Sequence, residues 1–190
     1  MKNTKSSKNS THNLIESVLF DHKVILQGIK ILAEKLNKKY KNKKHPIIFL
    51  GVLKGCLPFM MELIKHLKFD LKIDFMVVSS YFGGVEKRFQ KPKLILDVGN
   101  DLSDHHIVII EDIIETGITI QTIKKHLKLK EPKSIKVASL IYKKEMNIDN
   151  LEIVPDWYVF EAPMRFLVGF GLDFEEKLRN LDYIGILKGN

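Results

Sequence analysis

Short apolar runs constrain the fold of this chain more than any other feature. Residues 47–53 form one continuous run, and residues 106–110 form a second that is apolar after its first residue. Such runs are typical of strands covered on both faces, because neither face alternates with polar residues. Other segments place apolar residues at the 3.6-residue spacing of an amphipathic helix, most clearly residues 21–40. Buried strands that alternate with helices predict an α/β fold with a mainly parallel sheet flanked by helices.

The same patterns predict the remaining elements and their grouping. Helices are expected at residues 21–40, 58–67 and 118–129, and strands at 47–53, 73–80, 106–110, 134–142, 157–160, 166–170 and 183–187. Residues 93–98 are expected to pair back as the second arm of a long hairpin. A length of 190 residues suits one domain. We predict a disordered basic tail at residues 1–13 and a single domain at residues 14–190.

The positive charge of the chain is concentrated at its N-terminus. The net charge is +8, and residues 1–45 contain eleven lysines but only three acidic residues. This segment lacks the interleaved aromatic residues and recognition signatures of nucleic-acid-binding modules, so a solvated tail and helix face is the favoured interpretation. No apolar run approaches the length of roughly 18 residues that spans a bilayer. Neither a membrane nor a nucleic acid is expected as a partner.

The chain contains a single cysteine, Cys56, which indicates the redox environment of the protein and not a reactive site. An intramolecular disulfide is impossible, and the N-terminus has no apolar secretory segment, so we expect a cytoplasmic protein. We interpret Cys56 as a small buried hydrophobic residue and not as a reactive thiol.

The segment most informative about chemistry follows the apolar run at residues 106–110. Glu111 and Asp112 come directly after it, and Thr116, Gly117 and Thr119 precede the next predicted helix. Ligands of parallel sheets bind beyond the carboxyl ends of the strands, and free N–H groups make a helix start an anion site. The arrangement could hold a phosphorylated sugar, with hydroxyl groups on the acids. Considered alone, it is equally compatible with an ordinary helix cap beside surface acids.

This segment resembles the active-site signature of type I phosphoribosyltransferases, in which two acids close a strand and a Thr-Gly-x-Thr loop holds a 5-phosphate. Further segments are similar to the hypoxanthine-guanine branch of that family and follow in the family's order. Residues 52–55 resemble its pyrophosphate loop, and residues 79–81 resemble the start of its lid. Residues 139–144 resemble the strand that carries its base-recognition lysine, and residues 166–173 and 179–181 resemble its C-terminal binding segment. The similarity extends from about residue 15 to residue 187.

The resemblance implies a fold and an activity. The fold would be the type I phosphoribosyltransferase fold, with a small base-binding hood and a flexible lid hairpin. The activity would be Mg²⁺-dependent transfer of the ribosyl 5-phosphate of phosphoribosyl pyrophosphate to hypoxanthine or guanine. A homodimer or homotetramer is implied as well.

The resemblance also implies roles for the residues that contact the phosphorylated sugar. Glu111 and Asp112 would bind the ribose hydroxyls directly or through Mg²⁺, and Asp173 would bind the Mg²⁺ that carries pyrophosphate. Contacts to the 5-phosphate are expected from Thr116, Gly117 and Thr119. Contacts to pyrophosphate are expected from Lys54, Gly55 and Arg179, with a cis peptide bond between Lys54 and Gly55. Ser80 and Tyr81 would begin the lid.

For the purine, the resemblance implies three contacts. Lys143 would donate to the 6-oxo group, Phe166 would stack on the ring, and the Leu167 main chain would meet the ring edge near position 2. Lysine has donors only, so it can bind a 6-oxo group but offers nothing to the 6-amino group of adenine.

One residue departs from the family pattern. Glu115 stands where the family usually has the aspartate that removes a proton from the purine. The extra methylene shifts the carboxylate by roughly an ångström, a displacement that can cost about a hundredfold in rate. Glu115 and the basic N-terminal region leave one alternative open, a non-catalytic regulator that senses nucleotides on the same fold. A transferase that prefers xanthine is a second alternative, because the sequence does not rank hypoxanthine, guanine and xanthine.

Overall fold

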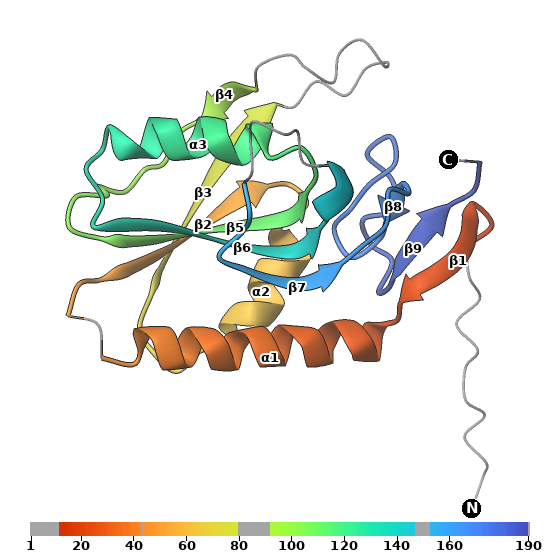
Figure 1. Cartoon of the computed structure of the whole chain (residues 1–190), viewed down its shortest axis with the longest axis horizontal. Coiled ribbons are helices and arrows are strands. Elements are labelled where there is room, and N and C mark those ends of the chain that lie inside the picture. The colour runs from red at the N-terminus through yellow and green to blue at the C-terminus, as the bar shows by residue number, and fades with distance from the viewer. Residues whose placement is uncertain (1–11, 43, 80–91, 147–152, 190) are drawn as a thin grey trace, which may run out of the picture.

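A computed structural model describes residues 12–42, 44–79, 92–146 and 153–189 (Figure 1). The helices are α1 (His22–Tyr40), α2 (Leu57–Ile64) and α3 (Ile118–Lys128), with a short 3-10 turn at Lys144–Met146. The strands are β1 (Ile15–Phe20), β2 (Ile47–Leu53), β3 (Lys72–Ser79), β4 (Lys93–Leu96), β5 (His106–Ile114), β6 (Ser134–Tyr142), β7 (Trp157–Glu161), β8 (Leu167–Val168) and β9 (Ile184–Leu187). Among the described residues, no helix is long and apolar enough to cross a membrane.

Six strands form the main sheet in the order β4-β3-β2-β5-β6-β7. The five strands from β3 to β7 in this order are parallel, and β4 runs antiparallel to β3, as the predicted hairpin arm requires. The prediction of a mainly parallel sheet is therefore confirmed. The lid segment, which includes Ser80 and Tyr81, lies outside the described residues, as do residues 1–11 of the predicted tail.

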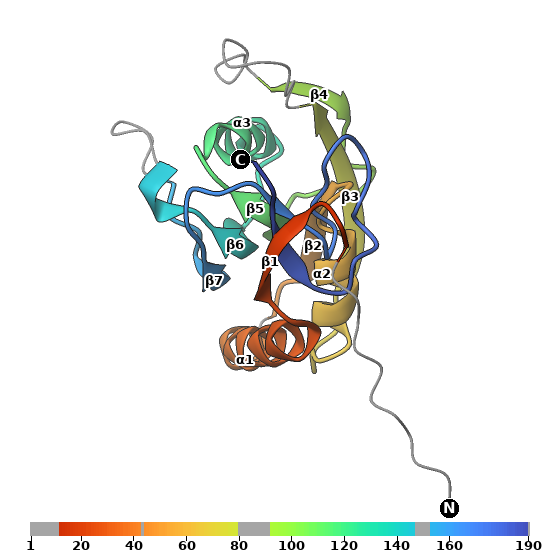
Figure 2. The same ribbon diagram turned by 90° about the vertical axis from the view of Figure 1, so that its right-hand side faces the viewer.

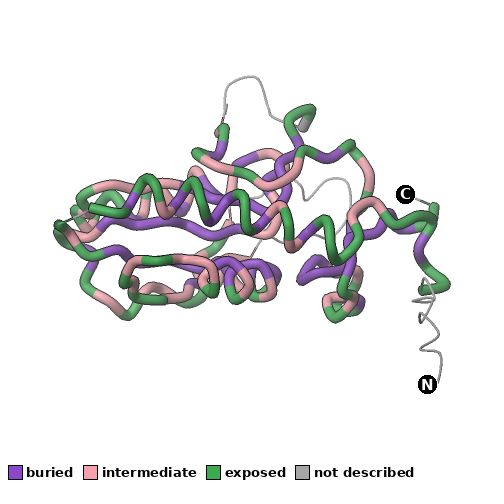
Figure 3. The backbone as a smooth tube through the Cα atoms, turned by 90° about the horizontal axis from the view of Figure 1, so that it is seen from below, coloured by how far each residue is buried: buried purple, intermediate pink, exposed green. Residues whose placement is uncertain are grey.

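The apolar runs of the central strands pack on both faces of this sheet. Phe49 of β2 and Val108 of β5 belong to the core cluster under α1 and α2. Their neighbours Ile48 and Ile107 point the other way, into the cluster under α3. Figure 2 shows α1 and α3 on opposite sides of the strands, and Figure 3 shows the buried segments running through the middle of the molecule. Two-sided burial explains why these strands have no polar alternation.

Strand β5 is longer than the sequence predicted, and this changes where its acids lie. The expected strand ended at residue 110, but pairing with β6 continues through Glu111↔Ser139 to Ile114↔Tyr142. Glu111 and Asp112 therefore lie within the strand, not after it. The prediction of the boundary was wrong because two charged residues in a row do not end a ladder whose backbone hydrogen bonds are independent of the side chains.

Strand β1 was missed by the sequence analysis. It pairs antiparallel with β9, at the other end of the chain, and β8 completes a small sheet of order β1-β9-β8. Only Ile15 of β1 is fully buried, so the segment has no clear apolar period. The small sheet lies beyond the arrowheads of β2, β6 and β7 (Figure 1). It occupies the position expected for the base-binding hood.

Cys56 precedes α2 and is completely buried. Burial raises the pKa of its thiol far above the ordinary range, and the nearby carboxylates of Glu111 and Asp112 raise it further. The interpretation of Cys56 as a buried hydrophobic residue is confirmed.

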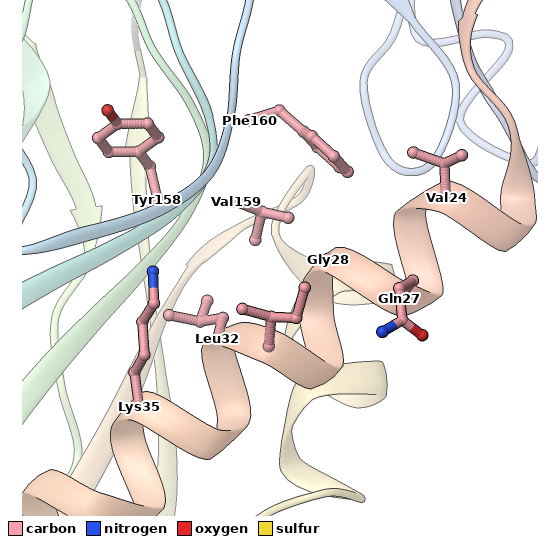
Figure 4. Close-up of a pocket in the computed structure, with 9 residues that line it drawn as sticks. Val24, Gln27, Gly28, Leu32, Lys35, Tyr158, Val159 and Phe160 are labelled. Atoms are coloured by element: carbon pink, nitrogen blue, oxygen red, sulfur yellow. The ribbon is translucent and has the colours of Figure 1, made fainter.

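We predict that Gly28→Ala destabilises the protein although it improves helix propensity. Gly28 of α1 faces β7, and an added Cβ would lie 2.4 Å from Val159 Cγ1 and 2.9 Å from Phe160 Cζ (Figure 4). Alanine gains about 1 kcal/mol in a helix interior, whereas overpacking costs about 1–3 kcal/mol. Urea denaturation should show a net loss of about 1 kcal/mol. The control Lys30→Ala, on the exposed face of α1, should stay near wild type. A more stable Gly28→Ala variant would contradict this packing.

Candidate active site

Two adjacent carboxylates, those of the buried Glu111 and the partly buried Asp112, lie near the end of β5. Glu111 is only 9% exposed, and its Oε2 atom is buried without a hydrogen-bond partner among the described residues. Burial raises its pKa well above the usual range, and the neighbouring charge of Asp112 adds to this effect. Burial also raises the pKa of Asp112, although the Ile113 N–H donates to its Oδ1 at 2.9 Å. Such a pair is suited to bind hydroxyl groups or a divalent cation.

The loop after β2 packs directly on this pair. A Cβ atom on Gly55 would lie 1.6 Å from Asp112 Oδ2, so only glycine fits there. On the other side of the loop, Gly171 has φ +100°, and a Cβ on it would lie 2.1 Å from the carbonyl oxygen of Gly55. Three segments that are distant in sequence therefore meet at Gly55.

The cis peptide bond of this loop lies between Leu53 and Lys54. The resemblance had suggested the bond between Lys54 and Gly55, and that prediction was wrong by one residue. The requirement for glycine at position 55 has a separate physical reason, which is the approach of the Asp112 carboxylate.

The start of α3 has the features of an anion site. Gly117 is the N-cap residue, with a left-handed φ of 77° and no side-chain cap on the first turn. Among the described residues, the Ile118 N–H makes only a long contact of 3.5 Å with Thr116 Oγ1, so the first-turn donors could bind a ligand. Thr119 lies in the first turn and is partly exposed.

A buried lysine lies at the end of β6. Lys143 is only 4% exposed, and its Nζ donates to Glu115 Oε1 at 2.5 Å and to the Arg165 carbonyl oxygen at 2.8 Å. Within the described part of the chain these bonds use two of the three ammonium protons, which leaves one for a ligand. The structure therefore brings together the two residues predicted for base recognition and proton removal. Arg165, which the sequence analysis did not identify, supplies the second acceptor from its backbone.

Phe166 and Leu167 follow directly after Arg165. The ring of Phe166 is 42% exposed and meets Phe174 edge to face, with centroids 5.9 Å apart and planes at 87°. Leu167 has a buried side chain and lies in β8, the edge strand of the small sheet. An exposed aromatic ring thus lies beside the segment that holds Lys143.

The residues predicted to contact pyrophosphate form an ion-pair cluster. Arg179 NH2 lies 2.8 Å from Asp173 Oδ1 and 3.1 Å from Glu176 Oε1. Lys54 Nζ lies 2.7 Å from Glu176 Oε2. Glu176 was not predicted, because nothing in the sequence distinguishes it from its neighbours Glu175 and Lys177. It became recognisable only when the fold placed it between two cations.

Two further observations limit what else could be the site. No group of three or more His, Cys, Asp or Glu side chains in the described part of the chain is arranged to hold a metal. A pocket between α1 and β7 is lined by apolar residues such as Val24, Leu32 and Phe160, with none of the predicted site residues (Figure 4). The predicted site residues lie instead in the cluster at the ends of the strands.

Comparison with known proteins identifies the family. Residues 17–175 match the phosphoribosyl transferase domain. The chain belongs to this family. It is 45% identical over 174 residues to the hypoxanthine-guanine phosphoribosyltransferase of Lactococcus lactis subsp. lactis (strain IL1403), with 92% of each chain covered. The hypoxanthine-guanine phosphoribosyltransferase of Streptococcus pneumoniae (strain ATCC BAA-255 / R6) is 42% identical over 176 residues, which cover 93% of this chain and 95% of that protein.

A solved structure agrees with this membership. The tetragonal crystal structure of a hypoxanthine phosphoribosyltransferase from Staphylococcus aureus is 36% identical, with a TM-score of 0.86 over 96% of this chain and 97% of that one. The resemblance to type I phosphoribosyltransferases is thereby confirmed, together with the fold class that it implied.

We predict that Gly55→Ala disrupts the site. The new methyl group and the Asp112 carboxylate cannot occupy the same space, so either the loop after β2 or Asp112 must move. Thermal unfolding should show a loss of about 2–3 kcal/mol. Gly99→Ala is the matched control, because nothing lies within 4 Å of a Cβ at that position. If both variants were equally stable, the contact between Gly55 and Asp112 would be wrong.

Proposed function

We propose that this phosphoribosyltransferase attaches the ribosyl 5-phosphate of phosphoribosyl pyrophosphate to hypoxanthine or guanine, and so produces IMP or GMP and pyrophosphate. One observation carries the proposal. Lys143, a residue with donors only, is buried at the end of β6 and held there by Glu115 and a backbone carbonyl. The names of the relatives support the same activity.

The purine would bind between the buried lysine and the exposed ring. The remaining proton of Lys143 is available to a 6-oxo group, whereas the 6-amino group of adenine is itself a donor and would leave that proton without an acceptor. Phe166 would stack on the purine, and the backbone of Leu167 would contact the ring edge. This arrangement would select 6-oxopurines over adenine. These three contacts do not discriminate among hypoxanthine, guanine and xanthine.

The phosphorylated sugar would lie across the ends of β5 and α3. The first-turn donors and hydroxyls of Thr116, Gly117 and Thr119 would bind the 5-phosphate, because a helix start favours negative charge. Glu111 and Asp112 would bind the ribose hydroxyls. The buried Oε2 atom of Glu111, which has no partner among the described residues, needs a donor or a cation of this kind.

The residues present fit a magnesium ion. Mg²⁺ binds through one or two carboxylates beside substrate phosphates and keeps several waters, so a large cluster of protein ligands is not required. Glu111, Asp112 and Asp173 would hold it. The chemistry that bound Mg²⁺ supplies is neutralisation of the charge on the departing pyrophosphate.

The reaction itself requires little from the protein beyond positioning and one proton acceptor. The C1′–O bond to pyrophosphate breaks, its electron pair leaves with pyrophosphate, and a bond forms between C1′ and the purine nitrogen. The proton of that purine would go to the Glu115 carboxylate, which its ion pair with Lys143 keeps beside the base. Lys54 and Arg179 would stabilise the charge that develops on the leaving group.

A catalytic role is favoured over a non-catalytic nucleotide sensor by the construction of the base site. A sensor of phosphoribosyl pyrophosphate does not need a buried lysine aimed at a purine, nor a carboxylate beside it. The proposal includes a homo-oligomer, as the resemblance implies, and a cytoplasmic location, which fits a single cysteine that is buried as a free thiol.

A steady-state assay with four purines tests the proposal. Purified protein, phosphoribosyl pyrophosphate and Mg²⁺ should convert hypoxanthine and guanine to their monophosphates, with adenine essentially inert because Lys143 has no acceptor. Activity should disappear in excess EDTA and return with MgCl₂. Preferential use of adenine would refute the base site, and preferential use of xanthine would establish the alternative specificity. Nucleotide binding without any turnover would establish the regulatory alternative.

We predict that Glu115→Gln lowers kcat by about a hundred- to ten-thousandfold, the usual contribution of a positioned general base. The affinity for phosphoribosyl pyrophosphate should hardly change, because the helix start still holds the 5-phosphate. Glu115→Asp retains the carboxylate at the family's usual length, so it should keep most activity or exceed the parent. The matched control is Glu145→Gln, at an exposed position that follows Lys143 and Lys144. A wild-type kcat for Glu115→Gln would mean that solvent accepts the proton.

A further inference from the structure

Glu176 is held in an unfavourable backbone conformation in the segment that follows Gly171. Its φ is 62°, and its neighbour Glu175 has a φ of 52°. Left-handed backbone is uncommon for residues other than glycine and persists only where the surroundings hold it. Here the Glu176 N–H donates to Asp173 Oδ2 at 2.9 Å. This turn directs the Glu176 side chain toward the pyrophosphate cluster.

The two carboxylate oxygens of Glu176 contact two different cations. Oε2 accepts from Lys54 Nζ at 2.7 Å, and Oε1 accepts from Arg179 NH2 at 3.1 Å. Lys54 and Arg179 belong to segments that are far apart in the sequence, and Glu176 is the carboxylate that joins them. A carboxylate that spans two cations in this way occupies the position that an oxyanion of a ligand would take.

The exposure of these groups shows which pairs can open. The side chains of Lys54 and Glu176 are 69% and 64% exposed, whereas those of Arg179 and Asp173 are 25% and 32% exposed. Exposed ion pairs contribute little net stability, since both ends are readily hydrated. The contacts of Glu176 can therefore be exchanged for a ligand at low cost, while Arg179 stays anchored by Asp173 and by its bond to the Gly171 carbonyl oxygen.

We propose that Glu176 is a specificity-determining residue: its carboxylate competes with pyrophosphate for Lys54 and Arg179 and is displaced when the ligand binds. The inference rests on the proposed function. A pyrophosphate group, with several charges and oxygens, displaces a single carboxylate, whereas a singly charged anion gains too little to do so. When the product leaves, Glu176 re-forms both ion pairs and so speeds release. Glu176 thus weakens the binding of pyrophosphate, and it favours pyrophosphate over singly charged anions and faster release of the product.

Binding of inorganic pyrophosphate in MgCl₂, measured by isothermal titration calorimetry on the full chain, tests the competition. Glu176→Gln removes the charge and should lower the dissociation constant by about three- to thirtyfold, the size expected for two exposed ion pairs. The difference from wild type should shrink as KCl is added, because exposed charges are screened. Glu176→Asn should give the same result, since asparagine tolerates the left-handed backbone.

Glu175→Gln is the matched control. Glu175 has the same backbone conformation and an exposed side chain, but it lies in none of the ion pairs among the described residues. Its variant should bind pyrophosphate as wild type does. Unchanged or weaker binding by both Glu176 variants would overturn the inference alone and would mean that Glu176 holds the cations in place for the ligand. Failure of the wild-type protein to bind pyrophosphate would overturn the proposed function, and the inference with it.

Discussion

The position of β5 between two parallel neighbours is the constraint on which the rest of this structure depends. Its backbone pairs with β2 on one side and β6 on the other, and both pairings are parallel. Parallel pairing brings the carboxyl ends of the strands to one edge, so the loops that follow them must meet there. The Gly55 loop, the Thr116–Thr119 turn and Lys143 follow these three strands. The site is thus a consequence of strand order.

One cation and two carboxylates with low or partial exposure lie at the carboxyl ends of β5 and β6, and they differ in which groups compensate their charge. Lys143 has a carboxylate and a carbonyl oxygen within hydrogen-bond distance, so its charge is compensated before any ligand arrives. Glu111 Oε2 has no hydrogen-bond partner among the described residues, Asp112 Oδ1 accepts from the Ile113 N–H, and burial raises the pKa of both carboxyl groups. A buried charge without a partner is costly. The contrast suits the proposed roles, because Lys143 is already held in place for a base, whereas the two acids would gain most from a ligand or a cation.

The two sides of the site also differ in exposure. The base side is built from a buried lysine and the small sheet, where little can move without loss of packing. The pyrophosphate side is built from exposed ion pairs on a turn with left-handed residues. Exposed ion pairs exchange partners readily, and this property suits the side of the site from which the highly charged pyrophosphate would leave. In the proposed reaction, this difference in burial would make the contacts rigid where the base is selected and exchangeable where the leaving group departs.

The sequence by itself determined most of the local structure and the family of the chain, and it proposed the residues of the site. Residues 134–142 were predicted to the residue, the two-sided apolar runs predicted the parallel sheet, and motif order identified the family. Only the tertiary structure decided that β1 pairs with β9, that β5 runs past its acids, that the cis bond precedes Lys54, and that Glu176 joins Lys54 to Arg179. Periodicity and motifs record short-range preferences. The pairing of β1 and the contacts of Glu176 depend on residues that are distant in sequence, and the cis bond and the length of β5 depend on backbone geometry that side-chain patterns do not encode.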